Sequence, residues 1–196
     1  TTDRAHVEHL GLVDLCLMPR AGYKGSGSTE FLQEFSLVSP NLPNRAARQA
    51  NGMLVNQLSY DEYLLIDTSL VPSTLITTMA KAWSLDDVPD CYQVPRQDSH
   101  GCLAVTGSEA SMLLSSLISV DLRLHRFANF QIAQTVLNEL SVIVIRCDLG
   151  DVPHYYLLAD ITSIEFLCAV LLDGMAEAGG GPVGLAAFNA LQRPRS

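Results

Sequence analysis

The feature that most constrains the fold is an internal similarity between the two halves of this 196-residue chain. The segment Tyr63-Leu-Leu-Ile-Asp67 is nearly copied as Tyr156-Leu-Leu-Ala-Asp160, at an offset of 93 residues. Apolar runs at residues 12–17 and 102–105 each precede a glycine turn, which is followed by apolar residues at helical spacing. A sequence that resembles itself in this way indicates one structural unit used twice.

Both halves carry patterns that predict strands and helices in the same order. In the first half we expect strands at residues 12–17, 52–58 and 63–67, and helices at 31–35 and 73–83. In the second half we expect strands at residues 102–105, 132–137, 142–147 and 155–159, and helices at 112–117 and 163–176. The predicted fold class is α+β, with two similar strand-helix-hairpin-helix repeats and mostly antiparallel sheets.

The segments between these elements indicate how the chain is divided. We assign residues 1–85 to the first repeat half, 86–99 to an acidic connector with two prolines, 100–178 to the second repeat half and 179–196 to a C-terminal tail. The two halves are expected to form one compact domain. The apolar residues of the tail are suited to docking on a neighbouring chain, and without one such a tail is usually disordered. These residues are Val183, Leu185, Phe188 and Leu191.

The stretch RAGYKGSGSTEFLQ at residues 20–33 resembles a phosphate-binding loop, because glycines and a lysine come before a predicted helix. A Walker loop needs its lysine after the last glycine, whereas Lys24 precedes Gly25 and Gly27. The dinucleotide fingerprint needs a glycine where this chain has Glu30, and the GxSxG nucleophile elbow is absent from this stretch. We therefore interpret the glycines as a tight turn and Lys24 as an exposed charge rather than an anion ligand.

The second glycine turn has a recognisable helix-start pattern. Thr106 and Glu109 have the spacing of a capping box, in which each side chain accepts a hydrogen bond from an otherwise unpaired backbone amide. A helix beginning near residue 109 is expected to be closed by this reciprocal pair.

Charge and hydropathy argue against several classes of protein. The net charge is −9, and the 12 Lys and Arg residues are scattered rather than gathered in a basic stripe, so nucleic acid is not an expected partner. The most apolar window, at residues 162–172, is shorter than the roughly 20 residues of a membrane span, and the charged N-terminus does not read as a signal peptide. Five cysteines without a CxxC motif are interpreted as buried, inert thiols of a cytoplasmic protein.

The chain is unusually apolar for a free-standing domain. Its apolar fraction is 48%, only 17% of its residues are charged, and its mean hydropathy is +0.21. A large core accounts for part of this, and coverage by partner subunits is the alternative. Phe127 and Phe130 are candidate interface anchors, since aromatic residues are enriched at interface cores, although ordinary core packing accounts for them equally well.

Few side chains are spaced for catalysis or metal binding. His6 and His9 lie three residues apart and could face one way on a helix, but no third ligand is near them in the sequence, so a solvated N-terminus is the simpler interpretation. Asp86, Asp87 and Asp90 lack the alternating oxygens, the glycine and the terminal glutamate of a calcium loop. We therefore predict no catalytic, cofactor-binding or metal-binding residue in this chain.

Several motifs, taken in order, resemble the gamma subunit of heterotetrameric sarcosine oxidase, which is related to the glycine-cleavage T-protein fold. In the first half they are KGSGSTEFL at residues 24–32 and LSYDEYLLI at 58–66. In the second half they are VTGSEASMLLSSLISVDLRLHRF at 105–127, AQTVL at 133–137 and VIVIR at 142–146. Two segments depart from the family, namely the N-terminus with His6 and His9 and the polar stretch at residues 39–51.

The resemblance implies a T-protein-like, folate-binding-like fold and a small non-catalytic structural subunit of a cytoplasmic flavoenzyme. The complex would oxidatively demethylate sarcosine or a related N-methyl amine, as an oxidase or a dehydrogenase. Its FAD, FMN, NAD, tetrahydrofolate and zinc are expected on other subunits, with none bound by this chain. The expected partners are the large flavoprotein alpha subunit and the beta and delta subunits of the same complex.

Two other functions are compatible with the sequence. A stand-alone folate-binding protein or aminomethyltransferase could be built on the same fold, although such proteins normally have a longer chain with a further domain. An unrelated α/β enzyme could use the glycine turn for a nucleotide, although the spacing of that turn argues against it.

Overall fold

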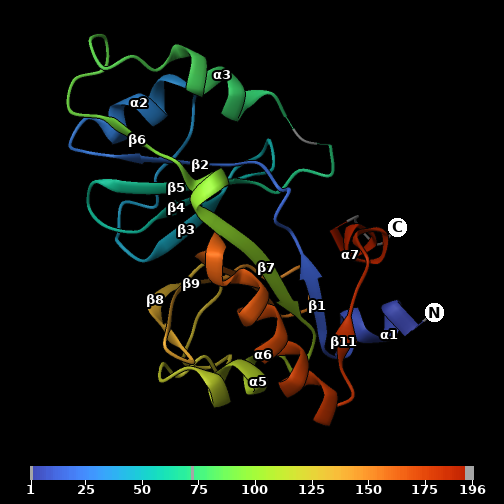
Figure 1. Ribbon diagram of the computed structural model, residues 1–196. Coiled ribbons are helices and arrows are strands. Elements are labelled where there is room, and N and C mark those ends of the chain that lie inside the picture. The colour runs from blue at the N-terminus through green and yellow to red at the C-terminus, as the bar shows by residue number, and fades with distance from the viewer. Residues whose placement is uncertain (1, 72, 193–196) are drawn as a thin grey trace. The chain divides into compact units, whose positions relative to one another are not determined.

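A computed structural model describes residues 2–71 and 73–192, and it divides the chain into two compact units. Residues 17–99 form one unit, which we call the central unit. Residues 1–16 and 100–196 form the other, which we call the terminal unit because it contains both ends of the chain. Figure 1 shows the elements of both units, and each unit is described here by itself.

The central unit is a five-stranded antiparallel sheet with helices α2 and α3 packed on one face. Its strands lie in the order β3-β4-β5-β2-β6. In chain order its elements are β2 (Arg20–Lys24), α2 (Ser28–Glu34), β3 (Arg45–Arg48), β4 (Met53–Gln57), β5 (Glu62–Asp67), α3 (Leu75–Ala82), β6 (Tyr92–Val94) and α4 (Arg96–Ser99).

Alternate residues of these strands form the core beneath the helices. Tyr23 of β2 and Tyr63 of β5 lie opposite each other, and both are almost fully buried. Phe31 of α2 packs on Tyr23 with ring centroids 4.9 Å apart, and Met79 is the buried residue of α3. The period-two pattern of the strands thus places aromatic rings under short helices.

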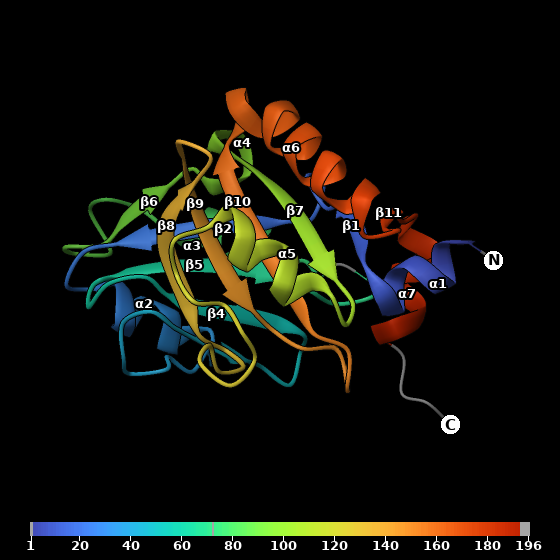
Figure 2. The ribbon, with the colours of Figure 1, turned by 90° about the horizontal axis from the view of Figure 1, so that it is seen from below.

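The terminal unit is a six-stranded mixed sheet with α5 and α6 on one face (Figure 2). Its strand order is β11-β1-β7-β10-β9-β8, with β11 parallel to β1 and the other neighbours antiparallel. Its elements are α1 (Thr2–His9), β1 (Gly11–Asp14), β7 (His100–Thr106), α5 (Ala110–Leu117), β8 (Ile132–Leu137), β9 (Leu140–Arg146), β10 (His154–Asp160), a 3₁₀ turn (Ile161–Ser163), α6 (Ile164–Glu177), β11 (Gly181–Pro182) and α7 (Leu185–Gln192).

Four neighbouring strands follow the same order in the two sheets, but the fifth strand of each comes from an unexpected part of the chain. The order β3-β4-β5-β2 corresponds to β8-β9-β10-β7. Beside β2 lies β6, the last strand before β7 in the chain, and beside β7 lies β1, the last strand before β2. The predicted boundaries assigned residues 11–14 to the first half, whereas β1 pairs with the second. Local patterns carry no information about such long-range pairing.

The strand before the first glycine turn also differs from the prediction. Only residues 12–14 of the apolar run at 12–17 belong to a strand, namely β1. The strand that enters the turn is β2, with the sequence RAGYK. Its counterpart is β7, so Gly25 corresponds to Gly107, and both have positive φ angles, +122° and +111°. A strand with two charged ends and a central glycine gives no apolar signal, which is why β2 escaped prediction.

The sequence similarity that suggested the repeat is one residue out of structural register. Gly22 pairs with Leu64, and the residue equivalent to Gly22, Ala104, pairs with Tyr156. Tyr63 therefore corresponds to Tyr155 rather than to Tyr156, and these two tyrosines both belong to the helix-covered cores. Tyr156 faces the opposite side of its sheet, because successive strand residues alternate between faces.

Part of the C-terminal tail packs on its own chain, whereas Leu185, which we also considered for docking on a neighbour, is 51% exposed. Val183 and Phe188 are buried, and the Phe188 ring lies 5.4 Å from that of His154. The Gly184 amide donates to Asp3 of α1 at 3.1 Å, which ties the two terminal segments together. Within residues 2–71 and 73–192, no helix has the length and apolar character needed to cross a membrane.

Candidate functional site

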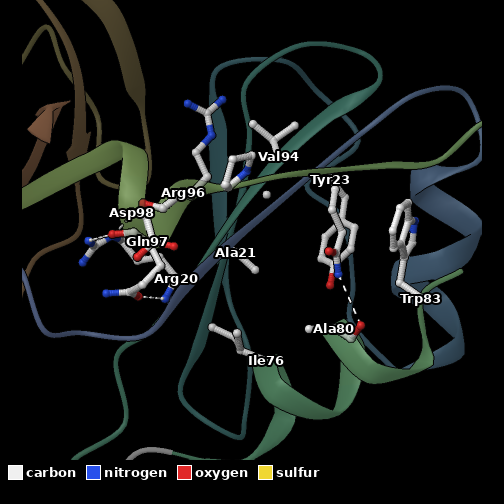
Figure 3. A pocket seen from close by; sticks show the side chains of 13 residues that line it. Arg20, Ala21, Tyr23, Ile76, Ala80, Trp83, Val94, Arg96, Gln97 and Asp98 are labelled. Atoms are coloured by element: carbon white, nitrogen blue, oxygen red, sulfur yellow. Dashed lines mark hydrogen bonds between the residues drawn. The ribbon is translucent and has the colours of Figure 1, made fainter. Parts of the chain in front are cut away.

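A pocket of about 520 Å³ in the central unit lies between α3 and the strands β2 and β6 (Figure 3). Strand β2 contributes Ala21 and Tyr23, and α3 with the residue after it contributes Ile76, Ala80 and Trp83. Its other lining residues are Arg20, Gly22, Gln93, Val94, Pro95, Arg96, Gln97 and Asp98. None of these residues was identified from the sequence, because no motif links them and they come together only through the pairing of β6 with β2.

Small residues keep this pocket open. The half-buried Ala21 and the exposed Ala80 bring only methyl groups to the space between β2 and α3. At Gly22 a Cβ atom would lie 2.8 Å from the Arg96 side chain and 2.9 Å from the Val94 carbonyl, so the glycine lets β6 and α4 approach the strand closely.

Tyr23 places a buried polar group at the pocket. The residue is fully buried in the core beneath the helices, and its side chain interacts with that of Gln93. Burial raises the pKa of Tyr23 to about 12, and the neighbouring Gln93 carboxamide offsets part of this effect. The Gln93 amide itself donates to the Ala80 carbonyl at 3.5 Å. The hydroxyl is therefore neutral and protonated near pH 7.

Trp83 and Pro95 protect the exposed edge of the sheet beside this pocket. The Trp83 indole N–H donates to the Cys91 carbonyl at 2.9 Å, just before β6 begins. Pro95 follows β6 and has no backbone N–H to offer. An edge strand of three residues closed at both ends in this way is a poor template for another strand.

Two buried arginines lie at the opposite side of the pocket and are engaged by the protein. Arg20 donates to the carbonyls of Met18 at 2.8 Å and Gln97 at 3.3 Å. Arg96 forms an ion pair with Glu62, and the same carboxylate receives Lys24 at 3.0 Å. Lys24, which we predicted to be an exposed loop charge, is the last residue of β2. Its side chain is more than half exposed and forms this ion pair with Glu62.

The amides of the first glycine turn are occupied by protein carbonyls. Gly25 donates to the Asp61 carbonyl at 2.8 Å, and Gly27 donates to the Asp90 carbonyl at 3.1 Å. A Cβ atom at Gly25 would lie 2.0 Å from the Asp90 oxygen, and one at Gly27 would lie 2.2 Å from the Pro89 oxygen. These glycines therefore make room for a crossing backbone segment.

The second glycine turn is covered in the same manner, and its predicted capping box is wrong. Glu109, the residue before α5, makes no side-chain cap hydrogen bond, and its amide donates to the His9 carbonyl at 3.0 Å. The Thr106 hydroxyl donates to the Val7 carbonyl at 3.2 Å. Backbone carbonyls at the end of α1 take the place of the two side chains.

The histidine pair His6 and His9 and the candidate interface anchors Phe127 and Phe130 do not form a common site. His9 Nε2 contacts the Ala178 carbonyl at 2.9 Å, and His6 is partly buried beside Gly181. Across residues 2–71 and 73–192, no three His, Cys, Asp or Glu side chains gather as metal ligands would. Phe127 is buried in the core of the terminal unit, whereas Phe130 is partly exposed with a φ angle of +63°.

The acidic connector lines a second, smaller pocket of about 320 Å³ in the central unit. Four carboxylate residues border it, and Phe31, Val88 and Pro89 contribute its apolar wall. These four are Glu30, Glu34, Asp87 and Asp90. Asp86 does not line this pocket. The four carboxylates come from α2 and from the connector, and not from one loop with the ligand spacing of a calcium site.

All five cysteines are free thiols. Cys91, Cys102 and Cys147 are buried, and Cys16 and Cys168 are partly exposed. Burial raises the pKa of both Cys91 and Cys168, which disfavours the reactive thiolate. The predicted burial therefore holds for three of the five thiols.

Comparison with solved structures identifies similar folds. The heterotetrameric sarcosine oxidase from Corynebacterium sp. U-96, in complex with pyrrole 2-carboxylate, contains a chain that is 19% identical, with a TM-score of 0.74 and coverage of 91% of both chains. The glycine cleavage system aminomethyltransferase T from Bartonella henselae is 17% identical, with a TM-score of 0.67. That match covers 97% of this chain and 52% of the aminomethyltransferase.

A scan against protein-family models finds no match, and a sequence search of curated proteins also finds none. The structural matches therefore establish the fold at sequence identities below 20%. The predicted α+β, T-protein-like fold is confirmed at that level.

Proposed function

We propose that this chain is the gamma-type structural subunit of a multi-subunit, flavin-dependent enzyme of the sarcosine oxidase type. The observation that carries the proposal is the reciprocal 91% coverage between this chain and one chain of the Corynebacterium heterotetramer. The aminomethyltransferase match accounts for only 52% of that longer enzyme. A match over 91% of one chain of an assembled heterotetramer supports a subunit role.

The surface of the terminal unit supports association with a partner. On its helical layer Met112 of α5 is 69% exposed and Phe166 of α6 is 51% exposed. Helix α5 carries no charged residue, and the charged residues of α6 are all acidic. Exposed apolar side chains on helices whose only charges are acidic fit a partner surface that combines apolar and basic residues.

In this proposal the chemistry belongs to the larger subunits. The complex oxidatively demethylates sarcosine or a related N-methyl amine, and it holds FAD, FMN, NAD, tetrahydrofolate and zinc outside this chain. The large flavoprotein alpha subunit is the direct partner, with beta and delta subunits in the same assembly. The role of this chain is to cover and stabilise its partner.

Co-expression with a candidate large flavoprotein subunit from the same source tests this role. We expect the two chains to copurify, to give a flavin absorbance spectrum and to lose solubility when either is expressed alone. The double substitution Met112→Lys and Phe166→Lys should abolish copurification of the partner. The control substitution Tyr60→Lys, at a side chain of the central unit that is 83% exposed, should leave copurification unchanged. A well-behaved monomer that ignores the flavoprotein contradicts the proposal.

A stand-alone folate-binding or aminomethyltransferase-like protein is the second candidate. The observation that favours it is the match of 97% of this chain to aminomethyltransferase T. Calorimetric titration of the isolated chain with tetrahydrofolate separates the two candidates. Saturable binding favours the second, and absence of heat combined with copurification of the flavoprotein favours the first.

A further inference from the structure

The loop between α5 and β8 presents basic side chains on a chain whose net charge is −9 (Figure 2). Its residues 123–126, with the sequence RLHR, are all exposed, and we call them the RLHR loop. Leu122 and Phe127 on either side are buried in the core that α5 and α6 cover. The exposed residues are therefore held between two apolar anchors of the terminal unit.

Two buried side chains also hold this segment through its backbone. Arg146 of β9 is 8% exposed, and its Nη1 atom donates to the Leu124 carbonyl at 3.0 Å and to the Phe127 carbonyl. The Tyr155 hydroxyl of β10 donates to the Leu122 carbonyl at 3.1 Å. A loop that is fixed in this way loses little conformational entropy when it binds, and binding residues are often carried on loops that a rigid scaffold positions.

The two arginines of the RLHR loop differ in what they contact. Arg123 donates to the Asp121 carboxylate through Nε at 2.8 Å and through Nη2 at 2.7 Å. The Arg126 side chain forms no hydrogen bond or ion pair with any residue that the structure describes. Leu124, which lies between them in the chain, is 43% exposed. The loop therefore combines an apolar side chain with a cation that is available to an external carboxylate.

This combination fits an acidic protein surface rather than a nucleic acid. Arginine binds carboxylates through a planar fork of donors, and it is enriched among the residues that dominate binding at protein interfaces. Nucleic-acid binding requires several cations that neutralise successive phosphates. The loop has only one arginine beyond the Asp121 pair, and α6 of the same unit carries only acidic charges.

We propose that the RLHR loop docks on an acidic patch of the large partner subunit, with Arg126 paired to a carboxylate and Leu124 seated against apolar atoms beside it. This inference rests on the subunit role proposed above and adds the chemistry of one contact to it. Unlike the contact through Met112 and Phe166, this one depends on an exposed charge and is weakened by salt.

Competition during co-expression measures the contribution of this contact. A tagged flavoprotein subunit is produced together with two forms of the full chain, the unmodified one and a variant. Mass spectrometry then compares the ratio of the two forms in the captured complex with their ratio in the total lysate. We expect Arg126→Glu to be depleted about 30-fold, the effect of losing one residue that dominates an interface.

Three further variants identify the origin of this depletion. Leu124→Ala should be depleted about fivefold, because nearly half of the leucine side chain is still exposed and can be buried by the partner. Arg126→Lys keeps the charge and should be captured much better than Arg126→Glu. Arg4→Glu makes the same charge change at an exposed position of α1 and should not be depleted.

The outcomes separate this inference from the subunit role. Equal capture of Arg126→Glu and the unmodified chain overturns the inference and leaves the subunit role intact, because the unmodified chain still copurifies. If neither form is captured, the subunit role fails and the inference fails with it. Depletion of Arg126→Lys as strong as that of Arg126→Glu, or loss of capture after nuclease treatment of the lysate, also overturns the inference.

Discussion

Replacing Gly25 by alanine is expected to be among the most damaging single changes in the central unit. The residue has a φ angle of +122°, a conformation that costs a residue with a Cβ atom about 1–3 kcal/mol. The new Cβ would also lie 2.0 Å from the Asp90 carbonyl oxygen, well inside van der Waals contact. Forced displacement of packed backbone adds about 1–3 kcal/mol. Together these effects predict a loss of about 4 kcal/mol in the free energy of unfolding.

Urea unfolding followed by far-UV CD and by Trp83 fluorescence measures this loss, since Trp83 reports on the central unit. Gly150→Ala is the matched control, because Gly150 has a φ angle of +61° but nothing within 4 Å of the position of its Cβ. That control should cost only about 1–2 kcal/mol, the strain of a left-handed conformation. If Gly25→Ala is no more destabilising than Gly150→Ala, the crossing segment does not crowd the turn, and the explanation given for the glycines is wrong.

Three further predictions follow from buried side chains. Burial raises the pKa of Tyr23 and Tyr155 to about 12, so between about pH 10 and pH 12 both residues ionise in the unfolded chain but stay protonated in the folded chain. The free energy of unfolding should therefore fall over this pH range, by up to about 2.7 kcal/mol for each tyrosine. In urea titrations at alkaline pH, Tyr23→Phe should remove the part of this fall that is due to Tyr23. Arg146→Lys should cost about 1–3 kcal/mol in urea unfolding, because the lysine cannot reproduce the paired contacts to Asp148 and the contact to the Leu124 carbonyl. Phe188→Ala should cost about 3–5 kcal/mol and speed proteolysis of α7, whereas Leu185→Ala, at a half-exposed position on the same helix, should do neither.

The elements that could be predicted from sequence are those with a strong local apolar pattern. The strand predicted at residues 132–137 has those bounds in the structure, and the helix predicted at 163–176 lies at Ile164–Glu177. Strand β2 was missed because RAGYK has no run of apolar residues. Its burial comes from pairing with β5 on one side and β6 on the other, which is tertiary information.

The candidate site was beyond sequence reasoning for the same physical reason. Tyr23, Trp83 and Gln93 are separated by up to 70 residues, and only the pairing of Tyr23 with Gln93 brings them to one pocket. The predicted capping box failed for another reason. The amides of Ser108 and Glu109 donate to the carbonyls of Glu8 and His9, and the Thr106 hydroxyl is itself a donor, to the Val7 carbonyl. A local motif gives way when a distant segment satisfies the same amides better.

The two glycine turns have a common explanation that does not involve a ligand. In the central unit, Asp90 covers the turn at Gly25 and lies just before β6, which is the strand beside β2. In the terminal unit, His9 covers the turn at Gly107 and lies just before β1, which is the strand beside β7.

The hydrogen bonds of the two turns also match. The Gly27 amide donates to the Asp90 carbonyl and the Glu109 amide donates to the His9 carbonyl, at the same point of each turn. In both units the segment that leads into β6 or β1 crosses the corner between the neighbouring strand and its helix, and a carbonyl of that segment accepts a hydrogen bond at the start of the helix. A glycine with a positive φ angle gives the backbone room for this crossing. In a nucleotide-binding protein, amides at this position donate hydrogen bonds to a phosphate; in this chain they donate to backbone carbonyls of Asp90 and His9.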